Sequence, residues 1–408
     1  MNNKYNVLVG QSGGPTSVIN GSLYGVIKES LNHTDLIDNI YGMINGIEGF
    51  INEDILNISS DMSKHDIELL KTTPASYLGS CRFKLPADLS DNIYPKIFSL
   101  FEKYNIMYFL YIGGNDSMDT VAKLSAYAKS INSPVRIIGV PKTIDNDLVH
   151  TDHSPGYGSA AKFVASVVRD ITLDSGVYKQ DSVTIIEVMG RHAGWLTAAS
   201  ALARKYKGDN PVLIYLPEKP FDVDSFIQNI KDTLKYNNNV VICVSEGIKD
   251  KNGRFICEYE ANIKTDNFGH KMLTGCGKYL EGLVKEKLGI KVRSVELNVT
   301  QRCVSSFISK TDVDEAVLAG SYGVQRALLG DTGIMIAFKR SSEKTYSIEC
   351  VTVPCSNVCN LEQKIPEGWI NESGTDVNEN FINYALPLIQ GELRPPVVNG
   401  LFEYAYRK

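Results

Sequence analysis

Short apolar runs alternate with stretches of helical periodicity along most of the chain. The runs are rich in Val and Ile at successive positions, a pattern typical of strands buried on both faces. They predict strands at residues 5–9, 107–112, 136–140, 183–188, 212–216, 240–244, 292–297 and 333–338. The segments between them predict helices at residues 159–171, 193–206, 223–236, 277–288 and 312–329. The last helix follows a capping-box pattern, Thr311 to Asp314.

Strands of this kind separated by helices indicate a doubly wound α/β architecture with two parallel, Rossmann-like sheets. A length of 408 residues suits two domains. We expect one domain to comprise residues 1–155 plus about 301–360, and the second to comprise about 156–300. The weakly periodic segment 361–408 is expected to pack on the body, over the surface of one domain.

Charge, segment length and cysteine spacing argue against several classes of protein. The net charge of −5 argues against a nucleic-acid binder, which normally carries a basic stripe. The apolar run at 107–112 is far shorter than the roughly 20 residues needed to cross a bilayer, and the N-terminus has no signal-peptide pattern. The eight cysteines contain no CxxC pair, so we expect reduced thiols. These features favour a cytoplasmic protein with no membrane partner.

Ligands of parallel sheets bind beyond the carboxyl ends of the strands, so the loops there hold the candidate chemistry. The first predicted strand leads into Gly13 and Gly14, which let the backbone approach an anion at a helix N-terminus. The second leads into Gly114, Asn115, Asp116 and Ser117, which suit phosphate and magnesium. A plain tight turn and an ordinary helix N-cap remain alternative interpretations of these two loops.

The most specific segment follows the strand at 136–140. Lys142, Thr143, Asp145 and Asp147 lie within six residues of one another. They supply a cation for phosphoryl oxygens, a hydroxyl donor, and carboxylates that can take a proton from an attacking alcohol. A charged, solvated loop is the alternative.

Taken together, the Gly-Gly-x-Asp-Ser loop and Pro-Lys-Thr-Ile-Asp-Asn-Asp resemble the signature pair of pyrophosphate-dependent members of the phosphofructokinase family. Further segments resemble the family in the same order along the chain: residues 78–82, 155–159, 189–191, 245–247, 268–270 and 301–302. ATP-dependent relatives carry glycine at the positions of Asp116 and Lys142. The resemblance implies a glycolytic enzyme that reversibly transfers a phosphoryl group from pyrophosphate to the 1-hydroxyl of fructose 6-phosphate, with Mg²⁺.

The resemblance also implies roles for single residues. Asp145 would be the general base, with Lys142, Asp116 and Asp147 as the other catalytic residues. The phosphoryl donor would bind Gly13, Gly14, Arg82, Gly114 and Ser117. Metal ligands would be Asn115, Asp116 and Asp147. Fructose 6-phosphate would contact Thr143, Ile144, Met189, Gly190, Arg191, Glu246, Arg293, Val299, Gln301 and Arg302. Because the residue matching Arg293 comes from a neighbouring subunit in the family, a homodimer or homotetramer is implied.

Three positions depart from the family pattern. Asn115 stands where many relatives have an aspartate near magnesium, Val299 replaces a sugar-site histidine, and Ser182 replaces an inter-subunit phosphate arginine. The change at Ser182 predicts no allosteric control by nucleotides. Two alternative functions remain at this point: an ATP-dependent kinase of the same fold, and a catalytically silent regulatory subunit.

Overall fold

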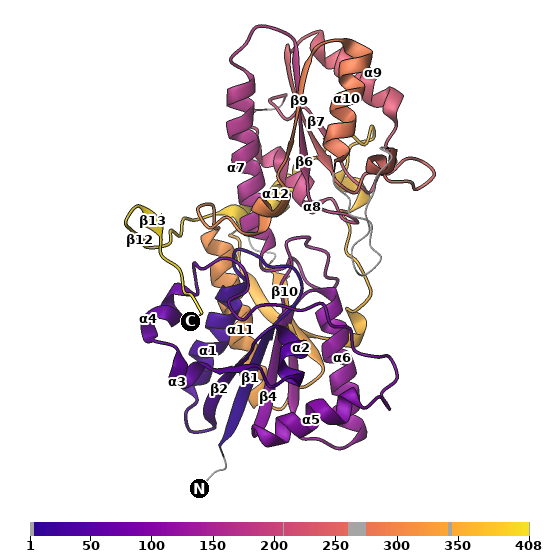
Figure 1. Cartoon of the computed structure of the whole chain (residues 1–408). Coiled ribbons are helices and arrows are strands. Elements are labelled where there is room, and N and C mark those ends of the chain that lie inside the picture. Colours follow the sequence, from indigo (N-terminus) through magenta and orange to yellow (C-terminus); the bar gives the residue numbers. More distant parts are fainter. Residues whose placement is uncertain (1–3, 207, 260–274, 342–344, 408) are drawn as a thin grey trace. The chain divides into compact units, whose positions relative to one another are not determined.

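The computed structural model describes residues 4–206, 208–259, 275–341 and 345–407. The chain divides into two compact units (Figure 1). Unit 1 comprises residues 1–159, 302–361 and 390–408, and unit 2 comprises residues 160–301 and 362–389. Residues 268–270, one of the segments that resemble the family, lie outside the described residues.

Unit 1 is built on a seven-stranded sheet with the order β11-β10-β5-β4-β1-β2-β3. Its strands are β1 (Tyr5–Gln11), β2 (Ile37–Met43), β3 (Ile55–Asn57), β4 (Ile106–Gly113), β5 (Arg136–Pro141), β10 (Ile334–Arg340) and β11 (Ile348–Pro354). The five inner strands are parallel, whereas β3 and β11 pair antiparallel with their neighbours at the two edges. The strands predicted in this unit all pair parallel with one another, as expected, whereas the antiparallel edge strands β3 and β11 were not predicted. The connection at 341–347 is too short for a crossover, so β11 folds back beside β10.

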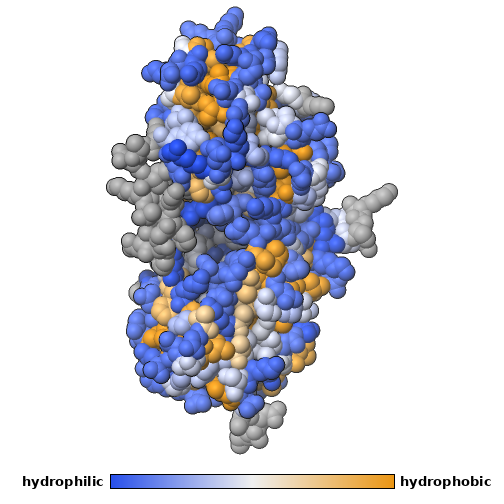
Figure 2. Space-filling model, turned by 90° about the vertical axis from the view of Figure 1, so that its right-hand side faces the viewer, coloured by the Kyte–Doolittle hydropathy of each residue, from blue (hydrophilic) through white to orange (hydrophobic). Residues whose placement is uncertain are grey.

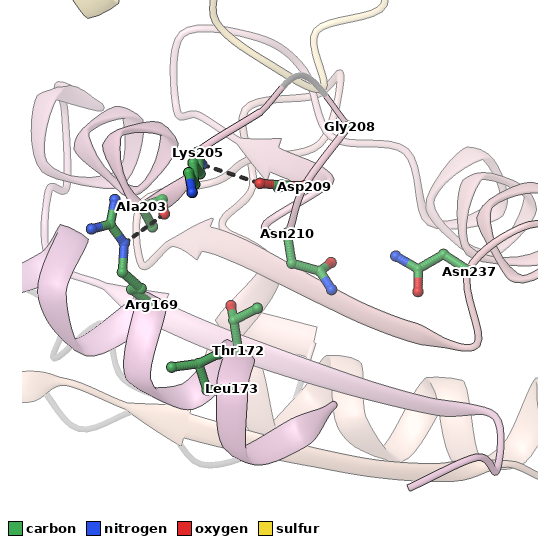
Figure 3. A pocket seen from close by; sticks show the side chains of 9 residues that line it. All are labelled: Arg169, Thr172, Leu173, Ala203, Lys205, Gly208, Asp209, Asn210 and Asn237. Carbon is green, nitrogen blue, oxygen red and sulfur yellow. Dashed lines mark hydrogen bonds between the residues drawn. The ribbon is translucent and has the colours of Figure 1, made fainter. Parts of the chain in front are cut away.

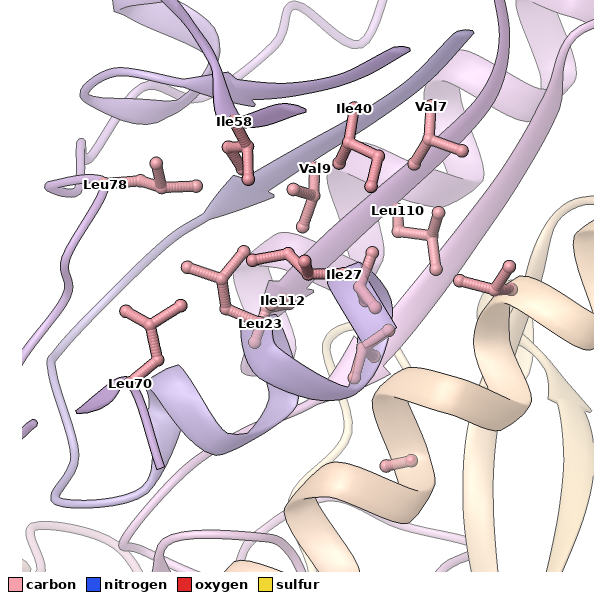
Figure 4. Packing of buried hydrophobic residues seen from close by; sticks show 14 of the residues in the cluster. Val7, Val9, Leu23, Ile27, Ile40, Ile58, Leu70, Leu78, Leu110 and Ile112 are labelled. Atoms are coloured by element: carbon pink, nitrogen blue, oxygen red, sulfur yellow. The ribbon is translucent and has the colours of Figure 1, made fainter. Parts of the chain in front are cut away.

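Helices cover both faces of this sheet. Successive strand residues point to opposite faces, so Val7 and Val9 of β1 pack in one buried cluster and Leu8 in another. The first cluster includes side chains of α1 (Ile19–Asn32) and α11 (Lys310–Leu328), as Figure 4 shows for Leu23 and Ile27. The second lies against α2 (Gly46–Ile51), α5 (Ile93–Lys103) and α6 (Asn115–Ser130). Burial on both faces explains the continuous apolar runs.

Helices α1 and α11 cross at very short range. A Cβ on Gly25 would lie 2.1 Å from the carbonyl oxygen of Val317, and one on Gly320 would lie 2.1 Å from that of Ser22. Only glycine fits at such a contact, because Cβ atoms do not approach backbone oxygen that closely. The α11 helix begins at Lys310 and is capped by Ser309 rather than by Thr311, which corrects the predicted capping box.

Unit 2 contains a four-stranded parallel sheet with the order β7-β8-β6-β9. Its strands are β6 (Ser182–Val188), β7 (Leu213–Tyr215), β8 (Asn239–Ser245) and β9 (Lys291–Glu296). The helices around it are α7 (Tyr157–Ser175), α8 (Trp195–Ala199), α9 (Val223–Leu234) and α10 (Cys276–Leu288). Apolar side chains of β6, β7, β8, α9 and α10 form its core. Two sheets of this kind confirm the predicted α/β fold class.

The single helix predicted at 193–206 is shorter in the structure. α8 ends at Ala199 and continues as a 3₁₀ turn over Ser200–Ala203. The Ser200 hydroxyl donates to the carbonyl oxygen of Thr197 over 2.6 Å, a local bond that competes with regular helix. Arg204 then leaves the helical conformation, and its guanidinium pairs with Asp376.

The C-terminal tail is divided between the two units, so the expectation that it covers one domain is not met. Residues 362–389, with α12 (Glu379–Ala385), pack on unit 2, where the Trp195 indole donates to the carbonyl oxygen of Gln363 over 2.9 Å. Residues 390–408, with the short hairpin β12 (Val397–Val398) and β13 (Leu401–Phe402), belong to unit 1. Ala405 there is buried in the core of the sheet.

The surface carries mixed polarity. Hydrophilic side chains cover most of the face shown in Figure 2, with small apolar patches between them. Scattered exposed apolar residues are ordinary on a protein surface. Within the described residues, no helix is both long and apolar enough to cross a membrane. In the described residues all eight cysteines have free thiol groups.

Candidate active site

Three loops follow the carboxyl ends of adjacent strands in unit 1. After β1 the chain passes to β2 on one side, and β4 and β5 lie on the other side of β1. The strand order therefore reverses between β1 and β4, the position where open parallel sheets bind ligands. The loops after β1, β4 and β5 contain Gly13 and Gly14, then residues 114–117, then residues 142–147.

Lys142 connects the first and third loops. Its ammonium donates to the carbonyl oxygen of Gly14 over 2.6 Å, and its backbone N–H donates to the carbonyl oxygen of Gly113 over 2.9 Å. A Cβ on Gly13 would lie 3.4 Å from the Lys142 Nζ, and one on Gly14 would lie 3.3 Å from Nη1 of Arg302. The structure thus brings together Gly13, Gly14, Lys142 and Arg302 at one end of the sheet.

The Lys142 side chain is only 3% exposed. Burial lowers the pKa of its ammonium, the carboxylates of Asp145 and Asp147 raise it, and Arg302 lowers it further, to about 8. A lysine in this state carries its charge at neutral pH with little surrounding water. Such a charge interacts strongly with phosphoryl oxygens, because water does not screen it.

The loop after β5 closes on itself. The Thr143 N–H donates to the carbonyl oxygen of Pro155 over 3.1 Å, and the Thr143 hydroxyl accepts from the Asp145 N–H at the same distance. Asn146 has a left-handed φ of 55° and is 1% exposed, and its side-chain oxygen accepts from the Ser154 N–H over 2.9 Å. Burial alternates along this segment, so Asp145 and Asp147 are half-buried on either side of Asn146.

Ile144 lies in the same loop but its side chain is 6% exposed and faces the interior. We predicted a substrate contact there. The alternation that half-exposes Thr143 and Asp145 turns the side chain of residue 144 inward, so a substrate contact there would be made by the backbone, and it stays a prediction.

The loop after β4 forms the first turn of α6. Ser117 is 2% exposed and its N–H donates to the carbonyl oxygen of Gly114 over 3.0 Å, whereas Asp116 in the same turn is exposed. A Cβ on Gly114 would lie 3.5 Å from the Lys142 carbonyl oxygen, so this loop runs beside the loop after β5.

Asn115 has structural partners on both sides of its amide. Its Oδ1 accepts from the Asn360 N–H over 2.5 Å, and its Nδ2 donates to the carbonyl oxygen of Leu361. The amide thereby fixes the last residues of unit 1 before the chain enters unit 2. These bonds favour an amide at this position, because a carboxylate has no N–H for Leu361. The predicted metal contact of Asn115 stays a prediction.

The segment at 78–82 is attached to the glycine loop. Ser80 donates its hydroxyl to the carbonyl oxygen of Gly13 over 2.7 Å, and the Gln11 side chain accepts from the Leu78 N–H over 2.9 Å. Arg82, the predicted donor contact, is exposed at the end of this segment.

In unit 2, the predicted sugar residues meet at the carboxyl ends of β6 and β8. The Gly190 N–H donates to Oε1 of Glu246 over 3.3 Å, and the Gly190 carbonyl oxygen accepts from the Ser245 hydroxyl over 2.6 Å. Gly190 has a φ of 132°, which favours glycine. A Cβ on Gly247 would lie 2.1 Å from the carbonyl oxygen of Arg191, so the two loops interlock at van der Waals distance.

Gln301 supports this site from the protein interior. It is 1% exposed, its Oε1 accepts from the Met189 N–H over 3.1 Å, and its Nε2 donates to the Asn298 carbonyl oxygen over 3.0 Å. Its side chain therefore orients Met189. Val299, in the same 3₁₀ turn (Asn298–Arg302), is 49% exposed.

Arg293 is separate from the other predicted residues of unit 2. It lies within β9, opposite Thr184 of β6, rather than at the carboxyl end of the sheet. Its Nη1 pairs with Oδ2 of Asp174 over 3.2 Å, and 43% of its side chain is exposed. β9 is the last strand in the order of this sheet.

Sequence reasoning missed a buried carboxylate near the sugar residues. Glu187 of β6 is 5% exposed, and its Oε2 accepts from the Gly277 N–H over 2.7 Å at the start of α10. Burial raises the pKa of this carboxyl, the N–H contact lowers it, and Glu296 and Glu246 raise it again, to about 7. A glutamate in an apolar strand run was the available signal, since burial of an acid requires a partner.

A cavity of about 480 Å³ lies elsewhere in unit 2, near the amino end of β8 (Figure 3). Arg169 on its wall donates Nε to the carbonyl oxygen of Ala203 over 2.9 Å. Its other walls include Leu173, Lys205, Asp209 and Asn237. None of the predicted site residues lines it.

The comparisons with known proteins agree with the fold and the site geometry described above. The family model described as Phosphofructokinase matches residues 6–325. A pyrophosphate–fructose 6-phosphate 1-phosphotransferase of Halomonas elongata is 40% identical over 98% of this chain and 95% of its own length, and that of Methylococcus capsulatus is 36% identical with the same coverage.

Among solved structures, the pyrophosphate-dependent phosphofructokinase of Nitrosospira multiformis superposes with a TM-score of 0.89. It is 34% identical, and the match covers 98% of this chain and 96% of that one. With a family model over most of its length and relatives of this similarity, the chain belongs to the phosphofructokinase family.

Proposed function

We infer that this chain transfers a phosphoryl group reversibly between pyrophosphate and the 1-hydroxyl of fructose 6-phosphate, giving fructose 1,6-bisphosphate and phosphate. The observation that carries this inference is the buried ammonium of Lys142 at the switch point of unit 1, hydrogen-bonded to the glycine loop. The relatives named for this reaction align over nearly the whole chain.

On the donor side, Lys142 acts as a fixed positive charge for phosphoryl oxygens. Phosphoryl transfer needs little covalent help from protein groups, and positioning with electrostatic stabilisation supplies most of the catalysis. The ammonium donates to the carbonyl oxygen of Gly14 and lies close to Gly13. We propose that Gly114 and Ser117 add backbone contacts to the donor and that Arg82 and Arg302 add guanidinium groups. The exposed Asp116 disfavours a donor that carries a third phosphate, because like charges repel there.

Asp145 acts as the general base. Its carboxylate accepts the proton of the sugar 1-hydroxyl as the oxygen attacks phosphorus, and the bond from phosphorus to the bridging oxygen breaks to release phosphate. In the reverse direction the protonated Asp145 returns the proton. Asp147 lies two residues along and adds a second carboxylate beside the same ammonium.

A divalent cation, Mg²⁺, fits this chemistry. Across the described residues, no group of three or more His, Cys, Asp and Glu side chains is placed to hold a metal ion by itself. Mg²⁺ is commonly bound through one or two carboxylates together with substrate phosphates. Asp116 and Asp147 are the residues that would hold it, and when bound it neutralises charge on the phosphoryl oxygens.

On the acceptor side, Glu246 supplies a carboxylate for sugar hydroxyls, and Met189, Gly190 and Arg191 form the adjoining loop. Arg302 and Arg293 would bind the 6-phosphate, since guanidinium groups match phosphate geometry. Because Arg293 lies on an edge strand away from the other residues, we propose that it serves the site of a second subunit in a homodimer or homotetramer. We place this enzyme in the cytoplasm, with its glycolytic substrates.

A coupled assay tests the proposal. Purified protein with fructose 6-phosphate and Mg²⁺ should turn over with pyrophosphate and hardly at all with ATP. Asp145→Asn keeps the size of the side chain and removes the base, and should lower kcat by about 100-fold or more. Rapid turnover with ATP alone would favour the ATP-dependent alternative, and inactivity with both donors would favour a silent subunit.

A further inference from the structure

A buried ionic cluster lies beside the later part of the loop at 142–156, which we call the return limb. Its centre is His153, which is 1% exposed. The His153 Nδ1 lies 2.8 Å from Oδ1 of Asp152, and its Nε2 lies 2.6 Å from Oε2 of Glu315 on α11. Two further groups complete the cluster: Arg340 of β10 pairs with Asp152 over 2.8 Å, and the Tyr346 hydroxyl donates to Oε1 of Glu315 over 2.5 Å.

The two contacts of the imidazole ring indicate that His153 is positively charged. A neutral imidazole has one N–H and so can donate to only one of the two carboxylates, whereas an imidazolium donates to both. Burial by itself lowers the pKa of His153, but Glu315 and Asp152 outweigh that effect and raise it to about 9. The Phe338 ring packs beside the imidazole at 5.1 Å between centroids.

Backbone contacts extend from this cluster toward the two aspartates of the loop. The Thr151 hydroxyl donates to the His153 carbonyl oxygen over 2.9 Å and accepts from the Phe338 N–H over 2.9 Å. The next residue, Ser154, donates its N–H to the side chain of Asn146. Asn146 lies between Asp145 and Asp147 in the chain. The hydrogen bond from Ser154 to Asn146 therefore couples the position of His153 to the positions of both carboxylates.

A second acid of α11 holds the end of the same limb. Asp312 lies one turn before Glu315, and its two carboxylate oxygens accept from the N–H groups of Gly156 and Ser159 over 2.8 Å each. α11 therefore anchors the return limb through hydrogen bonds at residue 153 and at residues 156–159. None of these contacts involves a residue assigned to substrate or metal.

We propose that His153, clamped between Asp152 and Glu315, is a positioning residue of phosphoryl transfer that sets the geometry of Asp145 and Asp147. The proposal rests on the proposed function, because it takes Asp145 as the base. A displacement of about 1 Å at a reacting group can lower a rate by about 100-fold, so a loosened limb reduces kcat. Apart from Thr143 and Ile144, the residues predicted to bind fructose 6-phosphate lie outside the loop at 142–156, so we expect KM for fructose 6-phosphate to stay near its wild-type value.

The first test is His153→Leu, which keeps the size of the side chain and removes both hydrogen bonds. We expect kcat with pyrophosphate to fall by about 10- to 100-fold, with KM for fructose 6-phosphate within about twofold of wild type. The assay is run at a temperature where circular dichroism shows the variant folded. A folded variant with wild-type kcat overturns the proposal, because a residue that only stabilises the fold would lower the melting temperature alone.

A pair of variants on the partner side covers the case in which His153→Leu does not fold. Glu315→Ala removes one side of the clamp. Glu315→Gln preserves it, since the amide oxygen accepts from Tyr346 and the amide nitrogen donates to a neutral His153. We expect kcat to fall by about tenfold or more in Glu315→Ala and by less than about threefold in Glu315→Gln. Equal kcat in the two variants overturns the proposal.

Two controls separate this proposal from the function it rests on. If Asp145→Asn is inactive while His153→Leu and Glu315→Ala match wild type in kcat, the positioning role of His153 is wrong and the assignment of Asp145 as the base stands. If Asp145→Asn retains full activity, the assigned base fails, whatever the clamp variants do. Nitrogen-15 spectra of histidine-labelled protein, assigned by the signal lost in His153→Leu, should show both His153 ring nitrogens protonated at pH 7.5. A neutral ring at that pH overturns the clamp.

Discussion

The ammonium of Lys142 donates a hydrogen bond of 2.6 Å to the carbonyl oxygen of Gly14. This contact joins the loop after β5 to the loop after β1, and it fixes a positive charge where the strand order of the sheet reverses. A flexible surface lysine could not hold its charge in one place. The burial of this one therefore bears directly on which phosphoryl donor the protein uses.

Donor choice should respond to Asp116 and Lys142 together. In Asp116→Gly/Lys142→Gly, the repelling carboxylate and the compensating ammonium are both removed. We expect the ratio of kcat/KM for ATP to that for pyrophosphate to rise by about tenfold or more, since removal of like-charge repulsion of about 1.4 kcal/mol gives that factor. Steady-state kinetics with each donor measure it. A folded double variant with an unchanged ratio would contradict the assignment.

The pH profile should report the ionisation of Lys142. Its pKa is lowered to about 8, so the ammonium is present below that pH and is lost as the pH rises through it. We expect kcat/KM for pyrophosphate to decline above about pH 8. Lys142→Arg keeps the positive charge at every accessible pH and should abolish this decline, although the larger side chain lowers the activity itself. A decline that persists unchanged in Lys142→Arg would assign it to another group.

Much of the fold could be predicted from apolar runs, because strands buried on both faces leave a continuous signal. β1, β4 and β5 lie within two residues of their predicted ends. β2, β3 and β11 were missed, because several of their residues are exposed or only partly buried and the apolar signal fades. The loops after β1, β4 and β5 were found from the sequence because each begins where an apolar run ends.

The support around the site could not be predicted, because it depends on partners far apart in the sequence. Asn115 binds residues 360 and 361, and Gln301 binds Met189. An amide side chain gives no sign in the sequence of which distant backbone group it will meet. His153 and Glu315 likewise meet only because α11 packs beside the loop.

Asn115 should contribute to stability through its two backbone contacts. In Asn115→Asp the donor to Leu361 is lost and a carboxylate faces a carbonyl oxygen. We expect the free energy of unfolding to fall by about 1–3 kcal/mol, the usual effect of leaving a polar group without its partner. Urea denaturation measures it. Asp116→Ala, one residue along and exposed, is the matched control and should stay within about 0.5 kcal/mol of wild type.

The opposite result for Asn115→Asp would also be informative. If the variant is as stable as wild type and binds Mg²⁺ more tightly in calorimetry, the position faces the metal rather than the backbone at 360–361. The structural role would then be wrong.

Glu187 should make stability depend on pH in a direction opposite to that of a salt-bridged acid. The pKa of its carboxyl is raised to about 7, against about 4.3 for an unfolded chain. The folded protein therefore binds this proton more tightly, and the resulting stabilisation is complete below about pH 4 and is lost as the pH rises through 7. Between pH 6 and pH 8 the wild type should lose on the order of 1 kcal/mol from this group.

Glu187→Gln isolates that effect. The amide oxygen still accepts from the Gly277 N–H, but nothing titrates, so the variant should lose less stability between pH 6 and pH 8 than wild type. Other groups, including His153, titrate equally in both proteins and cancel in the difference. Glu286→Gln, an exposed acid on α10, is the matched control and should follow the wild-type curve. Parallel curves for wild type and Glu187→Gln would mean that this carboxylate is already ionised in the fold at pH 6, with its charge held by the start of α10.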